Sequence, residues 1–347
     1  MNARKTEEEI AVRHPRETSE LFGHREAETA LLAAYRSGKI PHAWLIGGAQ
    51  GIGKATLAYR MARFVLTHRH AQLPAVQRAQ TLAVDPNDHV ARQVAAGAHG
   101  GLLVLERGLN DRGVLRTVIT VDETRETISF FGSTAAVEGW RVCIVDTVDE
   151  LNPNAANALL KILEEPPQQS LFLLVSHAPA RVLPTILSRC RKLPLRPLAT
   201  DDVIRAAAIA TGRPADDPAL IEAAEASEGS VSQALTLLGG DALKLQQRTA
   251  ALLARLPQVD PRELHALGES LPLSDRVALA AFTDSVERWV SERLRTDSNA
   301  NANLPRLARL AEVWEKIARA ARDTADYNLE RKPFVFSVFS QLAEATS

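Results

Sequence analysis

The stretch AWLIGGAQGIGKATLAYRMARFVL (residues 43–66) decides the fold of this chain. An apolar run at 43–46 leads into closely spaced glycines, and apolar residues then recur at helical spacing from Thr56 to Leu66. The segment Gly48–Thr56 fits G-x-x-x-x-G-K, in which backbone N–H groups and the lysine surround a phosphate at a helix N-terminus. The order therefore predicts a strand, a phosphate-binding loop and a helix.

The candidate nucleotide site lacks the hydroxyl that normally binds Mg²⁺. Ala55 stands where the pattern has Ser or Thr, and Thr56 lies about 100° further round the helix, so it is no automatic substitute. Two interpretations stay open: a loop that holds ATP or ADP with weak or no Mg²⁺, and a glycine-rich turn without a ligand. The residues predicted for the site are Gly48, Gly51, Gly53, Lys54, Ala55, Thr56 and, from a second strand, Asp146.

The second strand, Val142–Val145, ends in Asp146 followed by Thr147. In ATPases with this loop the aspartate holds Mg²⁺ through water, and a glutamate after it activates the attacking water. Thr147 cannot accept a proton, and Asp149-Glu150 do not directly follow an apolar strand, so we expect that pair in the next turn. Loss of a general base typically costs ~10²–10⁴ in rate, so we expect no independent ATPase activity.

Strands alternate with helices up to about residue 197, which predicts a parallel sheet with helices on its faces. Beyond that point Ala, Leu, Arg and Glu dominate, and only Phe334–Phe339 has the composition of a strand. We expect four parts: a flexible N-terminal arm (1–20), an α/β domain (21–197), a helical lid (198–240) and an all-helical domain (241–347). Other expected elements are helices at 26–36, at 154–164 and from an N-cap at Asp122 to Phe131, strands at 102–105 and 171–175, breaks at 211–218, 239–240 and 257–261, and a loop at 296–305.

The composition excludes several classes of protein. Lys and Arg total 41 against 42 Asp and Glu, so the net charge of −1 draws the chain to no nucleic acid, and DNA contact must be local or shared. No run approaches the ~20 apolar residues of a membrane span, and residues 1–20 lack a signal-peptide core, which predicts a cytoplasmic protein. Cys143 and Cys190 cannot form a zinc site alone, so we expect two buried thiols and no metal. We expect solvated loop positions for His68, His70, His89 and His99, and a metal site formed by these histidines is the minor alternative.

Five motifs together are similar to those of one known family. They are GKIPHA (38–43), NALLKILEEPP (157–167), LFLLV (171–175), LSRC (187–190) and GSVSQAL (229–235). Over about residues 15–240 the chain resembles the bacterial DNA polymerase III clamp-loader subunits, which are AAA+ proteins. The resemblance implies a RecA-like core, a helical lid and a helical collar that joins subunits. It also implies loading of the β sliding clamp on primer–template DNA together with gamma/tau and delta subunits.

The resemblance assigns a role to the motif Ser188-Arg189-Cys190. It implies that Arg189 reaches the γ-phosphate of ATP held by a neighbouring subunit and acts as an arginine finger. A guanidinium suits this role because it is permanently charged and its fork matches phosphate oxygens. The alternative is an ordinary arginine at a surface or a subunit interface.

The chain departs from the hydrolytic gamma/tau subunits of that family at three positions. They have a loop threonine, an Asp-Glu pair and a lid arginine, where this chain has Ala55, Thr147 and Ser232. The four-cysteine zinc module typical of many relatives is also missing. An incomplete site combined with an intact finger resembles the delta-prime branch. Two other functions stay as alternatives: a self-sufficient AAA+ ATPase of the gamma/tau type, and a metabolic P-loop kinase, for which no acceptor site is marked.

Overall fold

The computed structural model describes residues 14–108, 116, 118–132, 139–238, 242–273, 275–298 and 304–346. Contacts divide the chain into two compact units, one spanning Ala11–Ala234 and the other spanning Leu235–Ser347. The break expected at 239–240 lies outside the described residues. So does 299–303, the centre of the loop expected at 296–305, whose two flanks are helical.

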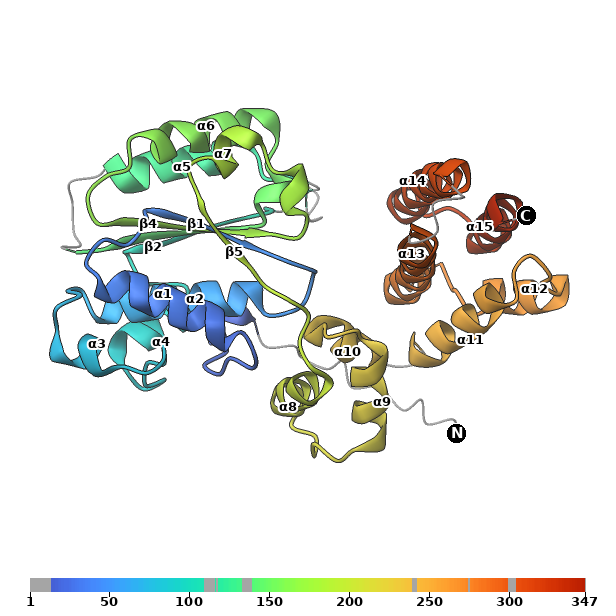
Figure 1. The fold of residues 1–347 in the computed structure, drawn as a ribbon, viewed down its shortest axis with the longest axis horizontal. Helices are drawn as coiled ribbons and strands as arrows, with labels where there is room; N and C mark the ends of the chain where they lie inside the picture. Colours follow the sequence, from blue (N-terminus) through green and yellow to red (C-terminus); the bar gives the residue numbers. More distant parts are fainter. Residues whose placement is uncertain are drawn as a thin grey trace, which may run out of the picture. The chain divides into compact units, whose positions relative to one another are not determined.

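A parallel β-sheet forms the centre of the first unit (Figure 1). Its five strands run in the order β2-β3-β4-β1-β5, and every neighbouring pair is parallel. The predicted α/β fold class is therefore confirmed. Only β5 was not predicted, because two of its four residues are charged and it has no apolar run. The strands are β1 (Ala43–Gly47), β2 (Leu102–Glu106), β3 (Arg141–Asp146), β4 (Ser170–Ser176) and β5 (Arg191–Pro194).

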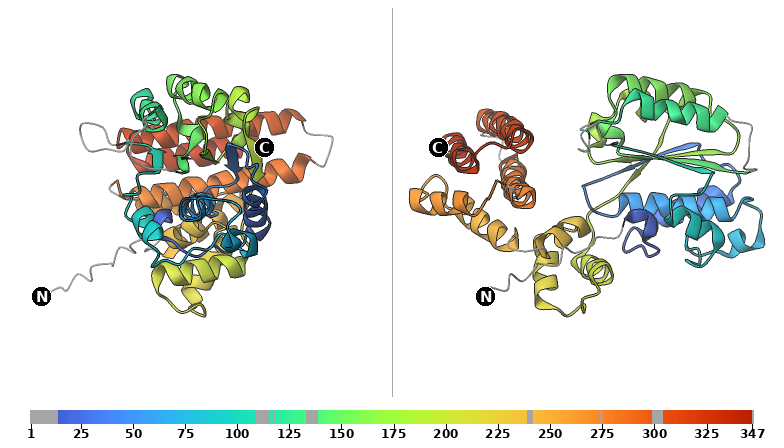
Figure 2. Two further views of the ribbon diagram at one scale, coloured as in Figure 1. Left: turned by 90° about the vertical axis from the view of Figure 1, so that its left-hand side faces the viewer. Right: turned by 180° about the vertical axis from the view of Figure 1, so that it is seen from behind.

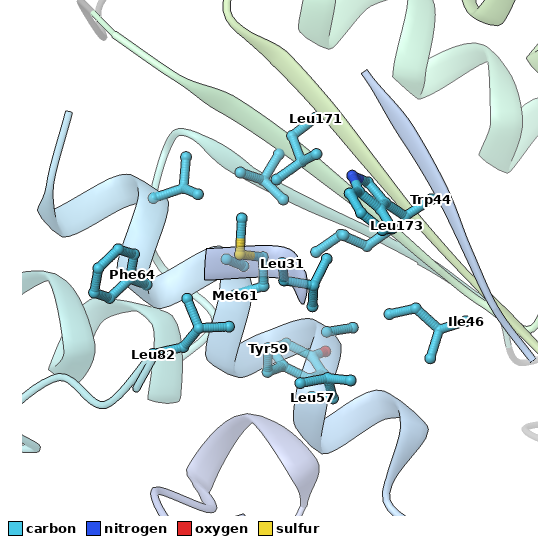
Figure 3. Packing of buried hydrophobic residues seen from close by; sticks show 14 of the residues in the cluster. Leu31, Trp44, Ile46, Leu57, Tyr59, Met61, Phe64, Leu82, Leu171 and Leu173 are labelled. Carbon is cyan, nitrogen blue, oxygen red and sulfur yellow. The ribbon is translucent and has the colours of Figure 1, made fainter. Parts of the chain in front are cut away.

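Alternate strand residues face opposite sides of the sheet, and each side packs on its own layer of helices (Figures 1 and 2). Trp44 and Ile46 of β1 lie in the cluster with α1 to α4, part of which Figure 3 shows. Ala43 and Leu45 lie in the cluster with α5 to α7. The helices are α1 (Arg25–Arg36), α2 (Lys54–Thr67), α3 (Pro74–Arg78), α4 (His89–Ala95), α5 (Val121–Gly132), α6 (Pro153–Glu164) and α7 (Pro184–Leu187).

Three short helices follow the sheet and correspond to the expected lid. Val203, Ala224 and Ala234, one from each helix, form a small core of their own. Pro218 opens the second helix, and Asp217 caps it by accepting the N–H of Ala219. The helices are α8 (Thr200–Thr211), α9 (Pro218–Ala226) and α10 (Val231–Leu238).

The regular elements that the structure describes in the second unit are all helices, which corrects one expectation. Phe334–Phe339 is part of a helix and not a strand. Phe334, Val335, Val338 and Phe339 are buried at helical spacing and Phe336 is exposed, because one face of α15 packs against α12 and α14. No described helix of the chain is both long and apolar enough to span a membrane. The helices are α11 (Ala242–Ala254), α12 (Pro261–Glu269), α13 (Arg276–Ser298), α14 (Leu304–Asp326) and α15 (Arg331–Thr346).

The prediction of a flexible N-terminal arm over residues 1–20 is wrong for residues 14–20. Pro15–Glu17 form a 3₁₀ helix that packs against α2 and α4. Two buried arginines of α2 hold the residues after it, since Arg60 donates to the carbonyl of Ser19 and Arg63 to that of Thr18. Buried guanidinium groups need acceptors, and the backbone of this segment supplies them.

The predicted helix at 122–131 is confirmed, but Asp122 does not cap it. The helix begins at Val121, so Asp122 lies in its first turn. The N–H and the hydroxyl of Thr120 both donate to the carboxylate of Glu123, at 2.6 and 2.9 Å. This is the reciprocal half of a capping box, in which the residue before the helix and the residue three further along satisfy each other.

The pair Glu28–Arg60 ties α1 to α2 and gives a test of this packing. Arg60 Nε donates to Glu28 Oε1 at 2.6 Å, and the Leu82 N–H donates to the same oxygen at 2.9 Å. Both residues of the pair are buried, each being less than a tenth exposed. We expect Arg60→Met to lower the free energy of unfolding by about 3–5 kcal/mol, because it leaves the Glu28 carboxylate buried without its cation. Urea unfolding followed by circular dichroism measures this.

The double variant Glu28→Gln/Arg60→Met is the matched control. A glutamine still accepts from the Leu82 N–H but carries no charge, so most of the lost stability should return. A cost below about 1 kcal/mol for Arg60→Met alone would contradict the assignment of this pair.

Candidate functional site

The phosphate loop connects β1 to α2 at the carboxyl end of the sheet. Gly48, Gly51 and Gly53 all have positive φ, of 154°, 76° and 96°. A Cβ at Gly48 would lie 2.6 Å from the carbonyl oxygen of Leu195, so the close approach of the two segments requires glycine there. The strand, loop and helix predicted from the sequence are confirmed.

Lys54 is the central charged group of the loop. Its side chain is buried, and its Nζ donates to the carbonyl oxygens of Gly48, at 2.8 Å, and Ala49. Burial lowers the pKa of Lys54 to about 8, while the negative charges of Asp146 and Asp149 act in the opposite direction. The ammonium is therefore directed at acceptor oxygens inside the loop.

Asp146 ends β3 beside the loop, as predicted. Burial raises the pKa of Asp146, and the carboxylates of Glu106 and Glu150 raise it further, whereas the charge of Lys54 opposes them. Glu106 is paired with Asp146 across the β2–β3 register. The structure thus brings Lys54 and Asp146 into one electrostatic group. Thr147, the next residue, is buried and offers no carboxylate.

The acidic pair Asp149-Glu150 lies in the turn after β3, as expected, where Val148–Glu150 form a 3₁₀ helix. The Asp149 carboxylate accepts from the hydroxyl of Ser176 at 2.7 Å and from the N–H groups of His177 and Ala178. Glu150 forms an ion pair of 3.0 Å with Arg107. Both carboxylates are engaged in the fold, so neither is a free base.

The lid contacts the loop directly at Gly51. The carbonyl of Gly51 accepts the N–H groups of Val231, at 3.0 Å, and Ser232, at 3.4 Å, which are the first two of α10. A Cβ at Gly51 would overlap the hydroxyl oxygens of Ser230 and Ser232. Ser232 is therefore packed on the loop.

Two histidines at the site were not predicted. His24 Nε2 lies 2.6 Å from the carbonyl oxygen of Ile52, and burial lowers the pKa of His24. His177 follows β4, and burial together with the charge of Lys54 lowers its pKa to about 4. Neither histidine belongs to a sequence pattern, because each lies far from the loop in the sequence and comes near it only in the folded chain.

Arg189 lies away from the phosphate loop. β5 begins at Arg191, which pairs with Trp44, and ends at Pro194, which pairs with Gly47 next to the loop. Arg189 precedes β5, so it lies at the amino end of the sheet while the loop lies at the carboxyl end. The structure does not bring the finger candidate together with the chain's own nucleotide site.

The side chain of Arg189 is one-third exposed and has three acceptors. Its Nη2 donates to Glu164 Oε1 at 2.7 Å, and its Nη1 donates to the Thr185 carbonyl at 2.9 Å and the Ser188 hydroxyl at 3.2 Å. Burial raises the pKa of the neighbouring Cys190 thiol to about 12, so this thiol is not a nucleophile near neutral pH. Glu164 was not predicted as a site residue.

A model of the family described as "DNA polymerase III, delta subunit" matches residues 23–199, just over half of the chain. The chain belongs to this family. Together with the delta' relatives below, the match confirms the predicted membership of the clamp-loader delta-prime family. The matched region contains the loop, Asp146 and Arg189 but ends before α8.

Curated relatives carry the same family name. The delta' subunit of DNA polymerase III from Pseudomonas aeruginosa is 38% identical over 149 residues, which are 43% of this chain and 41% of that protein. The delta' subunit from Escherichia coli is 31% identical over 226 residues, 65% of this chain and 62% of that protein. A tau/gamma subunit from Haemophilus influenzae is 28% identical over 64% of this chain and 30% of that protein. The chain therefore spans less than two thirds of each of these relatives.

Among solved structures, RuvB of Thermotoga maritima aligns with 93% of this chain and 91% of its own length, at 16% identity and a TM-score of 0.43. No conclusion is drawn from a likeness at that score. Among the residues that the structure describes, no three His, Cys, Asp or Glu side chains are grouped so as to hold a metal ion. Both cysteines are free; Cys143 is buried, as expected, and Cys190 is partly exposed.

His177 predicts a pH dependence of stability for this delta-prime family member. In the folded chain its pKa is about 4, against an ordinary value of 6.5, so between these pH values the unfolded chain binds more protons. The free energy of unfolding should therefore fall as the pH is lowered from 6.5 to 4. We expect the free energy of unfolding of His177→Gln to depend less steeply on pH, by an amount that corresponds to at most one bound proton. Urea unfolding at pH 7, 6 and 5 measures this.

His70→Gln is the control, because His70 is exposed. Its stability should follow the wild-type dependence on pH. An equal slope for His177→Gln and wild type would show that His177 is not held neutral in the fold.

Proposed function

We propose that this chain is a delta-prime-type subunit of a DNA polymerase III clamp loader. It assembles with gamma/tau and delta subunits and helps to load the β sliding clamp on primer–template DNA. Within the assembly it supplies Arg189 in trans to ATP bound by a neighbouring subunit. One observation carries the proposal: Arg189 is partly exposed at the amino end of the sheet, opposite to the chain's own phosphate loop.

The chemistry of Arg189 supports its role as a finger. A guanidinium keeps its charge at all relevant pH values and presents parallel N–H groups that match phosphate oxygens. Fingers of this kind are worth ~10³–10⁵ in rate where measured. Because β5 separates Arg189 from Gly47, Arg189 does not lie beside its own phosphate loop, which supports a role toward a phosphate held by another subunit.

For the chain's own site we propose binding of ATP or ADP with little or no Mg²⁺. The fit to a phosphate is supported by Lys54, a buried cation whose partners are loop carbonyl oxygens that phosphate oxygens can replace. The fit to Mg²⁺ is poor, because Ala55 supplies no hydroxyl and the pKa of Asp146 is raised. Thr147 supplies no base, so bound nucleotide is not hydrolysed.

The alternative of a self-sufficient ATPase needs a general base next to Asp146. The nearest candidates by sequence are Asp149 and Glu150, of which the first accepts from three donors and the second pairs with Arg107. Recruiting either would break contacts of the fold. The in-trans proposal needs no such change.

The finger is tested by Arg189→Ala in the reconstituted assembly with gamma/tau and delta. We expect normal folding and assembly, with turnover at the neighbouring ATP site reduced ~10³-fold or more, because the charge that stabilises the transferred phosphoryl group is lost. DNA-stimulated ATPase and clamp loading are the measurements.

Two further variants sharpen this test. Arg189→Lys keeps the charge but not the fork and should recover only a small part of the rate. Arg181→Ala removes another exposed arginine, from the turn after β4 at the other end of the sheet, and should behave as wild type. Unchanged turnover with Arg189→Ala in an intact assembly would overturn the finger assignment.

The nucleotide site is tested by titrating ATP and ADP into the isolated full chain, with Mg²⁺ or with a chelator. We expect the same affinity in both, because the side chains that normally hold the metal are missing. Lys54→Ala should weaken binding about 10- to 100-fold, the value of a charge-assisted hydrogen bond, whereas Lys192→Ala should not. Binding that requires Mg²⁺, or no binding by wild type, would contradict this proposal.

A further inference from the structure

The guanidinium of Arg189 is held in one orientation by its own subunit. Nη1 donates to the Thr185 carbonyl and the Ser188 hydroxyl, which both belong to α7 and its end. Nη2 donates to Glu164, the last residue of α6, which is the only charged partner of Arg189 seen in the described residues. The side chain thus has a neutral anchor on one nitrogen and an ionic contact on the other.

We propose that Glu164 is a positioning residue for Arg189, whose carboxylate orients the guanidinium and is the group that the γ-phosphate of a neighbouring subunit's ATP replaces. This inference rests on the proposed in-trans function of Arg189. It adds a residue that the resemblance does not assign, and it gives the two nitrogens of the arginine different tasks.

The exchange is chemically matched. A carboxylate and a phosphate both present anionic oxygens to the same N–H groups of a guanidinium. If Nη1 keeps its contacts to α7, Nη2 can exchange Glu164 for a phosphate oxygen while the rest of the side chain keeps its conformation. An arginine ordered in advance loses less conformational freedom when it binds.

The contact is weak enough to be released. The side chain of Arg189 is 33% exposed and that of Glu164 is 50% exposed. Exposed ion pairs of this kind change an equilibrium by only about 1.5- to 5-fold, so Glu164 competes mildly with the incoming phosphate. A buried pair at this place would instead withhold the finger.

Two substitutions separate the orienting effect of Glu164 from the competing effect of its charge. Glu164→Gln keeps an acceptor for Nη2 but removes the charge, so in the reconstituted assembly we expect ATPγS to bind about 1.5- to 5-fold more tightly with kcat unchanged. Glu164→Ala removes both effects, so kcat at the neighbouring site should fall several-fold. Glu165→Gln makes the same change of net charge at the next residue and should resemble wild type.

A second readout uses the isolated full chain labelled with ¹⁵N-arginine, in which Arg189→Lys identifies the signal. We expect Arg189 Nε–H to be ordered in wild type and in Glu164→Gln, and mobile in Glu164→Ala. An Arg189 signal with equal mobility in all three would overturn the positioning role. So would identical kinetics of Glu164→Ala and wild type in an assembly whose ATPase depends on Arg189.

The outcomes distinguish this inference from the proposed function. If Arg189→Ala leaves ATPase unchanged, the finger assignment fails, whatever Glu164 does to the NMR signal. If Arg189→Ala abolishes turnover and the Glu164 variants match wild type, the finger stands and the positioning role fails. On the Arg189→Ala background, Glu164→Gln should have no effect on ATPγS binding, and an effect there would contradict the proposal.

Discussion

The parallel pairing of β1 with β4 on one edge and with β5 on the other decides where each candidate group lies. Gly47 ends β1 next to Ser176 of β4 and Pro194 of β5, so the phosphate loop and the end of β4 meet at the carboxyl end of the sheet. The same pairing places the start of β5, and Arg189 before it, at the opposite end of the sheet, where the strands begin. A shift of one residue in this register would exchange the side chains that a strand presents to the two layers of helices.

The charged groups Lys54 and Asp149 beside the loop, of which Lys54 is buried and Asp149 is partly buried, are satisfied by the chain itself. Lys54 donates to two loop carbonyls, and Asp149 accepts from a hydroxyl and two backbone N–H groups. Charges left without partners in such a place would cost several kcal/mol, so these contacts are conditions of the fold. Binding of a nucleotide phosphate to Lys54, as proposed, would require the phosphate oxygens to replace the carbonyl oxygens of Gly48 and Ala49 as acceptors.

The local parts of this architecture were predictable, because their causes lie within a few residues of one another. The apolar run and the glycine spacing at 43–54 define a strand, a loop and a helix start. The end of β3 at Asp146 follows from the apolar residues before it. Composition misled at Phe334–Phe339, where aromatic and β-branched residues favour a strand but their burial has helical spacing in the packed bundle.

The parts that could not be predicted depend on contacts between distant residues. Residues 14–20 are ordered because Arg60 and Arg63 need acceptors, which the segment's own composition does not reveal. Gly51 meets Ser232 across the α/β domain and the lid, and Glu164 meets Arg189 from 25 positions away. Motif matching found the arginine, but only the folded arrangement shows what holds it.

The proposed function also explains why a finger belongs at the amino edge of the sheet. In an arc of subunits joined by one repeated head-to-tail contact, two different surfaces of neighbouring subunits meet. The surface that carries one subunit's phosphate loop then contacts the opposite surface of its neighbour. A subunit at one end of such an arc can serve its neighbour without a hydrolytic site of its own. Ala55 and Thr147 are compatible with that place, because the function then depends on Arg189 and the surface around it. The ion pair with Glu164 lies on the same surface as Arg189, so the proposed function assigns control of turnover to the surface that would face the neighbour.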